Sequence, residues 1–179
     1  MKRLILSILM IAASCGLMAQ EESTIKIPSG YQGSIDHGTS FRLWDGTRTV
    51  TAFSTTHGFF FNPHTYIGVG VGLEGGNDYF AMPVYTTLKY VFTVGKSVSP
   101  AAQVRVGSYL SDASGAYGDV ALGLRFASKR DFAVNVMISG SFLSNIEEET
   151  ITRINGTNTT VESVTRNPSH IGLRIGIEW

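Results

Sequence analysis

The sequence predicts an all-β protein, an eight-stranded antiparallel up-and-down transmembrane β-barrel. The last stretch, His170–Trp179, alternates between two faces. Its apolar face consists of Ile171, Leu173, Ile175, Ile177 and Trp179. Similar alternation returns in seven earlier segments, as expected for strands that are apolar outside and polar inside. After Ala19 no run of about 18 apolar residues could form a spanning helix, so only a closed barrel could cross a membrane.

The N-terminal residues 1–19 have the organisation of a secretory signal peptide. Lys2 and Arg3 precede the apolar run Leu4–Ala13, and Ala19 offers a small residue for cleavage. This run is shorter than the roughly 20 residues that a spanning helix needs. We therefore expect export and removal of the segment.

Cleavage would leave residues 20–29 as a short periplasmic lead and residues 30–179 as the outer-membrane barrel domain. The alternative is a lipoprotein acylated at Cys15, the single cysteine of the chain. Ala12, three residues before it, is a poor match to the usual leucine, and one acyl chain would add only marginal anchoring.

The composition agrees with a membrane barrel and disfavours several other classes. Charged residues make up 16%, below the roughly 25% of soluble domains. Glycine is abundant at 20 residues and proline scarce at 5, which suits closely packed sheets. Fourteen basic residues balance fourteen acidic ones, so no nucleic-acid partner is expected.

The first two strands are the weakest by pattern. Gly30–Thr39 is the least apolar segment. In Thr49–Phe60 the period is ambiguous, because Val50, Ala52 and Phe53 break strict alternation. We therefore use the clearer strands to decide which side of these two faces lipid and which faces the interior.

The third and fourth strands are clear. In Tyr66–Glu74 the apolar residues oppose three glycines, and a helix would lose about 1 kcal/mol at each glycine. The next strand begins at Pro83, a position that proline tolerates. The remaining strands alternate equally well and are predicted at Ala101–Leu110, Gly118–Ala127, Phe132–Leu143 and His170–Trp179.

The connections alternate in length, short after the second, fourth and sixth strands and mostly longer elsewhere. Short periplasmic turns and longer outside loops give this pattern, with both termini in the periplasm. The longest connection, Ser144–Asn167, contains two β-prone runs around Asn155 and Gly156. Asn-Gly is a strong hairpin signal, so we predict that the seventh and eighth strands extend past the membrane as a protruding hairpin, with these two residues at its exposed tip. A disordered loop is the alternative, given Glu147–Glu149.

The inward face of the strands collects equal numbers of acidic and basic residues. They are Asp36, Glu74, Asp119, Glu178, Lys89, Arg105, Arg125 and Arg174. An eight-stranded barrel is just wide enough to be filled by its own side chains. Because buried charges must be paired, we predict a barrel-interior charge network that plugs the barrel. A catalytic or binding pair among these groups is the alternative.

Aromatic residues near the turn-side strand ends could form a girdle at the membrane interface. They are Tyr66, Tyr90, Phe92, Phe126, Phe132 and Trp179. Tyr66 is the weak member, because the parity of its strand points inward. A soluble sandwich or lipocalin-like barrel would need its apolar face inside, which the inward glycines of Tyr66–Glu74 disfavour.

No catalytic or metal-binding pattern emerges. The four histidines, expected at the surface or in the girdle, do not share strands at metal-ligand spacing. Ser169 and His170 could suggest a hydrolase, but adjacent residues of a strand point to opposite faces. We expect no enzyme activity, no metal and no cofactor.

Several stretches resemble the small outer-membrane barrels common in Bacteroidota, often labelled the porin family. These stretches are Gly30–Gly33, His57–Pro63 followed by Ile67–Gly72, and Met82–Tyr85. The resemblance implies a Gram-negative outer-membrane barrel similar in architecture to OmpX and the barrel domain of OmpA. A terminal aromatic such as Trp179 resembles the signal by which barrel-assembly machinery recognises its clients.

The favoured hypothesis is a non-enzymatic, monomeric outer-membrane barrel that acts through exposed loops in binding or envelope integrity. Its expected partners are outer-membrane lipid, the barrel-assembly machinery during insertion, and an extracellular ligand at the loops. One alternative is a narrow passive porin for small solutes. The other is a lipid-modifying barrel enzyme.

Overall fold

The computed structural model describes residues 27–43, 49–76, 80–110, 115–128, 132–143, 146–154, 158–166 and 169–179. The predicted signal peptide with Cys15, residues 20–26 of the predicted lead, and the hairpin tip at Asn155 and Gly156 lie outside the described residues. No helix within the described residues is long and apolar enough to cross a membrane.

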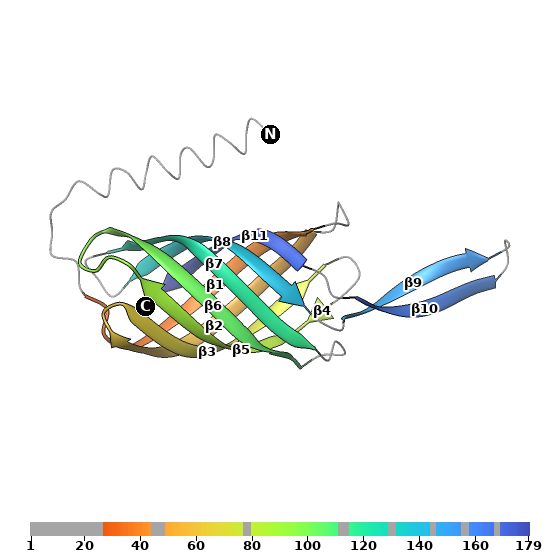
Figure 1. Cartoon of the computed structure of the whole chain (residues 1–179), viewed down its shortest axis with the longest axis horizontal. Coiled ribbons are helices and arrows are strands. Elements are labelled where there is room, and N and C mark those ends of the chain that lie inside the picture. Colours follow the sequence, from red (N-terminus) through yellow and green to blue (C-terminus); the bar gives the residue numbers. More distant parts are fainter. Residues whose placement is uncertain are drawn as a thin grey trace, which may run out of the picture.

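Eight long antiparallel strands form a closed barrel (Figure 1). They are β1 (Gly30–Arg42), β2 (Thr49–Asn62), β3 (Thr65–Gly75), β5 (Pro83–Val91), β6 (Val98–Tyr109), β7 (Ala116–Ala127), β8 (Ala133–Leu143) and β11 (Ser169–Glu178). Pairing of β1 with β11 and of β2 with β3 completes the ring, so the predicted fold class is confirmed. The short β4 (Phe80–Ala81) pairs with the end of β3.

Closure joins the first and last strands of the barrel. Ser34 lies opposite Glu178, and the register continues to Arg42 opposite His170. Beyond the last ladder pair, Gly33 and Trp179 exchange two backbone hydrogen bonds of 3.1 Å each. A Cβ on Gly33 would fall 2.9 Å from the indole of Trp179, so this close approach requires glycine. The last residue is therefore part of the closed wall.

The two faces of the wall follow the predicted parity. In β5 buried and exposed residues alternate without a break. The ambiguous strand β2 is resolved by its pairing with β3, in which Phe53 faces Leu73 on the outside and Ala52 faces Glu74 on the inside. Every Asp, Glu, Lys and Arg of the eight barrel strands is buried.

The two ends of the barrel differ. The turn end contains the β2–β3, β5–β6 and β7–β8 connections and the C-terminus, and the loop end contains the remaining connections (Figure 1). In the β2–β3 turn, the Asn62 side chain accepts hydrogen bonds from the backbone N–H of His64 and of Thr65, both at 2.9 Å. Gly95, with φ of 78°, provides the left-handed residue of the β5–β6 turn.

The predicted hairpin is present at the loop end as β9 (Ile146–Ile154) and β10 (Asn158–Arg166). Figure 1 shows it projecting beyond the barrel. These strands form a separate two-stranded sheet, whereas the sequence suggested that the neighbouring barrel strands themselves would extend. The hairpin is therefore an appendage to a barrel wall that closes without it.

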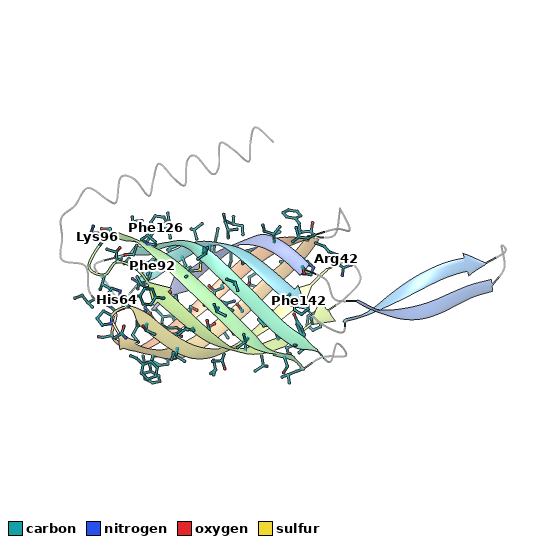
Figure 2. All side chains as sticks on the ribbon, in the orientation of Figure 1. Arg42, His64, Phe92, Lys96, Phe126 and Phe142 are labelled. Atoms are coloured by element: carbon teal, nitrogen blue, oxygen red, sulfur yellow. The ribbon has the colours of Figure 1, made fainter. Side chains whose placement is uncertain are left out.

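The aromatic girdle differs from the prediction at one residue. Tyr66 is 3% exposed and lies inside the barrel, so its assignment to the girdle was wrong and its strand parity was the better guide. Tyr90, Phe92, Phe132 and Trp179 are exposed on the outer face, and Figure 2 places Phe92 and Phe126 at the turn end. The pattern also missed further exposed aromatics near this end, namely Tyr31, Phe59 and Phe61.

Candidate functional site

The interior of the barrel is the candidate functional site. The structure places all eight predicted charged residues there, and none is more than 8% exposed. They project from six different strands, because each strand contributes only its inward positions. They form three layers along the barrel, which we call the turn-end, middle and loop-end layers.

The turn-end layer is centred on Glu178, which is 1% exposed. Its carboxylate forms an ion pair with Lys89 and a second with Arg125, whose Nε lies 2.8 Å from Oε2. Asn135 donates a third hydrogen bond of 2.7 Å from Nδ2. The Lys89 ammonium also lies 5.0 Å from the ring centre of Tyr66. One carboxylate thus links β11 to β5, β7 and β8 across the lumen.

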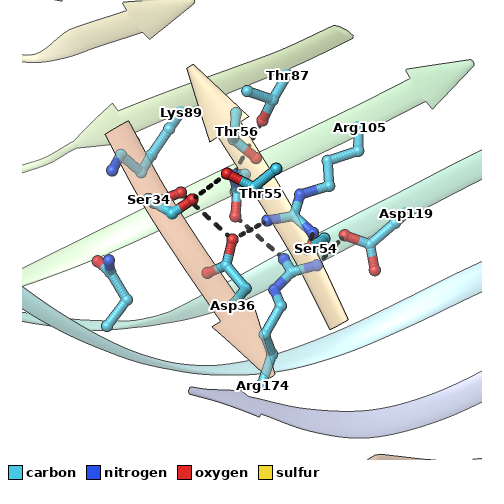
Figure 3. A network of polar contacts seen from close by, with 12 residues as sticks. Ser34, Asp36, Ser54, Thr55, Thr56, Thr87, Lys89, Arg105, Asp119 and Arg174 are labelled. Carbon is cyan, nitrogen blue, oxygen red and sulfur yellow. Dashed lines mark hydrogen bonds and ion pairs between the residues drawn. The ribbon is translucent and has the colours of Figure 1, made fainter. Parts of the chain in front are cut away.

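The middle layer contains two arginine–aspartate pairs (Figure 3). Arg105 Nη2 lies 2.7 Å from Asp36 Oδ2, and its Nη1 donates to Ser54 Oγ at 3.2 Å. The same guanidinium lies 4.8 Å from the ring centre of Tyr85, a favourable cation–π distance. The first strand is thereby tied to the opposite side of the barrel.

Arg174 forms the second pair of the middle layer. Its Nη1 lies 2.7 Å from Asp119 Oδ1, and its Nη2 donates to Gln103 Oε1 at 3.1 Å. Gln103 in turn donates to Thr87 Oγ1 at 2.9 Å. Figure 3 shows the guanidinium groups of Arg105 and Arg174 pointing into the centre of the barrel, between Asp36 and Asp119.

The loop-end layer is organised differently. Glu74 accepts a hydrogen bond of 3.4 Å from Tyr109 Oη. Within the described part of the chain, no cation lies within ion-pair distance of this carboxylate. The ring of Tyr117 packs against those of Tyr85 and Tyr109, with centroids 5.7 Å apart in each pair. Aromatic rings therefore pack close to this carboxylate.

The sequence pattern missed two residues of this layer. Arg42 is buried in the wall, because β1 continues beyond the predicted end at Thr39. Extending the alternation of that strand would have found it. His170 is 2% exposed inside the barrel, so its expected place at the surface or in the girdle was wrong, although its inward parity was correct.

Between the middle and loop-end layers lies a cavity of about 40 Å³. Its polar lining includes Asp36, Glu74, Arg105, Asp119, Arg174 and His170. One water needs roughly 10–15 Å³ measured in this way, so the cavity has room for a few waters and not for an organic solute.

The described residues show no arrangement suited to metal chemistry. Among them, no group of three or more His, Cys, Asp or Glu side chains is placed to hold a metal ion. Outside the barrel, His57 contacts Tyr31 Oη at 2.6 Å and Thr55 Oγ1 at 3.1 Å through its two ring nitrogens. That contact set suits a structural histidine on the outer wall.

Comparisons with known proteins place the fold among small outer-membrane β-barrels. Neisserial surface protein A superposes with a TM-score of 0.57 at 12% identity, covering 83% of this chain and 94% of that one. The N-terminal β-barrel domain of Pseudomonas aeruginosa OprF gives 0.49 at 11% identity, with 83% and 97% covered. The Yersinia pestis outer membrane protein Ail gives 0.41 at 13% identity, with 83% and 99% covered. No protein-family model and no curated protein matches the sequence. The likeness to the neisserial protein shows a shared fold.

Proposed function

We propose that the protein is a monomeric, non-enzymatic barrel of a Gram-negative outer membrane, with a plugged interior and a loop end that acts in binding or envelope integrity. The observation behind this proposal is the layered interior, in which four ion pairs cross the lumen. The predicted signal peptide would direct export, and the fold shared with outer-membrane barrels supports the location.

The outer wall supports contact with lipid. Exposed aliphatic and aromatic side chains cover all eight barrel strands, for example Ile35, Val69, Leu88 and Leu122. A lysine or arginine on this face at the bilayer midplane would cost ~2–4 kcal/mol. The burial of every charged residue of these strands avoids that cost.

Single-channel recording in a planar bilayer tests the plug. We expect no steady open current from the purified, folded protein. Four ion pairs cross the lumen, and the cavity of about 40 Å³ beside them has room for only a few waters. A conducting porin reconstituted in the same way is the control. Sustained currents would support the alternative of a narrow pore for small solutes.

The non-enzymatic part of the proposal is tested on lipid. Ser169 and His170 point to opposite faces of β11, so they cannot act together as nucleophile and base. Co-expression in a Gram-negative host should therefore leave the mass spectrum of lipid A unchanged. A new lipid A species that depends on the protein would show a lipid-modifying enzyme.

We also propose that Trp179 is an assembly signal read by the barrel-assembly machinery. Its indole packs over Gly33 and its backbone pairs with the same residue, at the seam where the barrel closes. Deleting Trp179 should sharply lower the fraction of protein that migrates as a heat-modifiable folded band from membranes. Trp179→Phe, which keeps a terminal aromatic, is the matched control. Equal insertion of the deletion variant and the wild type would refute this role.

The loop end is the proposed binding surface for an extracellular ligand, with the β9–β10 hairpin as its most projecting part (Figure 1). Because the hairpin forms its own sheet, replacing residues 146–166 by a short turn should leave the heat-modifiable barrel intact. Loss of the folded band would show instead that the hairpin is needed to close the wall.

A further inference from the structure

A second pocket, of about 200 Å³, lies at the turn end of the barrel. The start of β1, the end of β7 and the C-terminus surround it, so it is separate from the cavity of the loop-end half. Its lining includes Gln32, Phe60, Arg125, Phe132 and Trp179. Polar side chains and aromatic rings both line it, so the pocket is amphipathic.

Arg125 offers hydrogen-bond donors to this pocket. The residue is 6% exposed, and its Nε is used in the ion pair with Glu178. Within the described residues, its two Nη nitrogens have no hydrogen-bond partner. The planar guanidinium group can donate to both oxygens of a carboxylate at once. A lysine ammonium, which acts as a point charge, matches this geometry less well.

Gln32 also lines this pocket. Its Oε1 is buried and has no hydrogen-bond partner. The backbone at this position is fixed, because the Gln32 carbonyl oxygen accepts a hydrogen bond of 3.1 Å from Tyr66 Oη. An unsatisfied buried acceptor is costly, so a ligand with an N–H beside its carboxylate would satisfy both polar groups at once.

The remaining walls and the volume restrict the size of the ligand. Phe60, which is buried, and Phe132 and Trp179 at the rim supply the aromatic walls. Pockets for drug-sized ligands measure roughly 300–1,000 Å³, so a pocket of about 200 Å³ suits one residue-sized group.

We propose that this pocket binds the carboxy-terminal residue of a peptide with an apolar last side chain. The terminal carboxylate pairs with the Nη nitrogens of Arg125, the amide N–H donates to Gln32 Oε1, and the side chain packs against Phe132 and Trp179. Under the topology proposed above, the pocket faces the periplasm. Binding to this pocket requires neither that the lumen be closed to solutes nor that the loops bind a ligand, so either proposal can fail without the other.

The experiment uses the full mature chain in lipid nanodiscs, with Trp44→Phe so that Trp179 alone reports by fluorescence. The probe is N-acetyl-L-leucine, which has the carboxylate, the N–H and an apolar side chain. N-acetyl-L-leucinamide lacks the carboxylate, and 4-methylpentanoate lacks the N–H. We expect a saturable fluorescence change with N-acetyl-L-leucine, and binding about tenfold weaker or more for each of the other two compounds.

Two variants separate the two polar contacts. Gln32→Leu should abolish the preference for N-acetyl-L-leucine over 4-methylpentanoate and keep the preference over the amide. Arg125→Gln should abolish the preference over the amide and keep the preference over 4-methylpentanoate, provided that the variant still gives a heat-modifiable band. Val69→Ala, on the outer wall and not in the lining of the pocket, is the control and should bind as the wild type does.

Three results would overturn the proposal. They are equal binding of the acid and the amide, no saturation by N-acetyl-L-leucine at millimolar concentration, and an unchanged preference in Gln32→Leu. Because Gln32→Leu touches no ion pair, the test does not depend on the folding of the Arg125 variant.

Discussion

Two buried carboxylates on the inner wall, Glu178 and Glu74, have opposite surroundings. Glu178 is contacted by Lys89, Arg125 and Asn135, which come from three other strands. Within the described residues, Glu74 has only the hydrogen bond of 3.4 Å from Tyr109. The same residue type on the same face is therefore fully paired at one end of the barrel and sparsely paired at the other.

This difference shows that the plug is not uniform along the barrel. Around Glu178 the charged groups connect β11, which pairs with β1 at the closing seam, to β8, β7 and β5. Towards Glu74 the rings of Tyr85, Tyr109 and Tyr117 take the place of ion pairs. We infer that the charge pairing that stabilises the barrel is concentrated in the turn-end half. We expect substitutions in the loop-end half to cost less stability, which suits a region beside the proposed binding surface.

The largest effect is expected for Glu178→Gln. Neutralising this carboxylate leaves Lys89 and Arg125 as buried cations without their counter-charge, and breaking a buried pair in this way costs about 3–5 kcal/mol. Urea unfolding and refolding in detergent micelles would measure the free energy without the assembly machinery. If the free energy of unfolding fell by less than about 1 kcal/mol, the ion pairs of the turn-end layer would contribute little to stability.

An intermediate effect is expected in the middle layer for the pair Arg105 and Asp36. Arg105→Met and Asp36→Leu each leave one buried charge alone, whereas the double variant removes both. The double variant should therefore lose less stability than the sum of the two single variants, by about 1–3 kcal/mol. Additive losses in the same urea series would show that the pair is not coupled.

Much of the fold could be predicted because a membrane barrel imposes one rule on every strand, apolar outside and polar inside. Strands such as β3, β5 and β11 obey it residue by residue. The rule was weaker in β2, because small apolar residues such as Val50 and Ala52 fit the lumen as well as lipid. It was misapplied to Tyr66, whose amphipathic side chain suits either a girdle or a polar interior.

The membership of the interior could be predicted, but its partnerships could not. The alternation placed the eight charged residues on one face, but alternation says nothing about which of them are in contact. Which of them meet depends on how strands are staggered around the barrel, so Lys89 reaches Glu178 from 89 residues away. A balanced count of four and four does not reveal that Glu178 takes two cations and Glu74 none among the described residues.

The smallest effect is expected for Glu74→Gln. This carboxylate has no cation partner in the described residues, so the substitution leaves no buried charge uncompensated, and the amide oxygen can still accept from Tyr109. The free energy of unfolding should change by less than about 1 kcal/mol, as for a single neutral hydrogen bond. If Glu74→Gln instead cost as much as Glu178→Gln, a cation must pair with Glu74 in the folded protein, and the two halves of the interior would be alike.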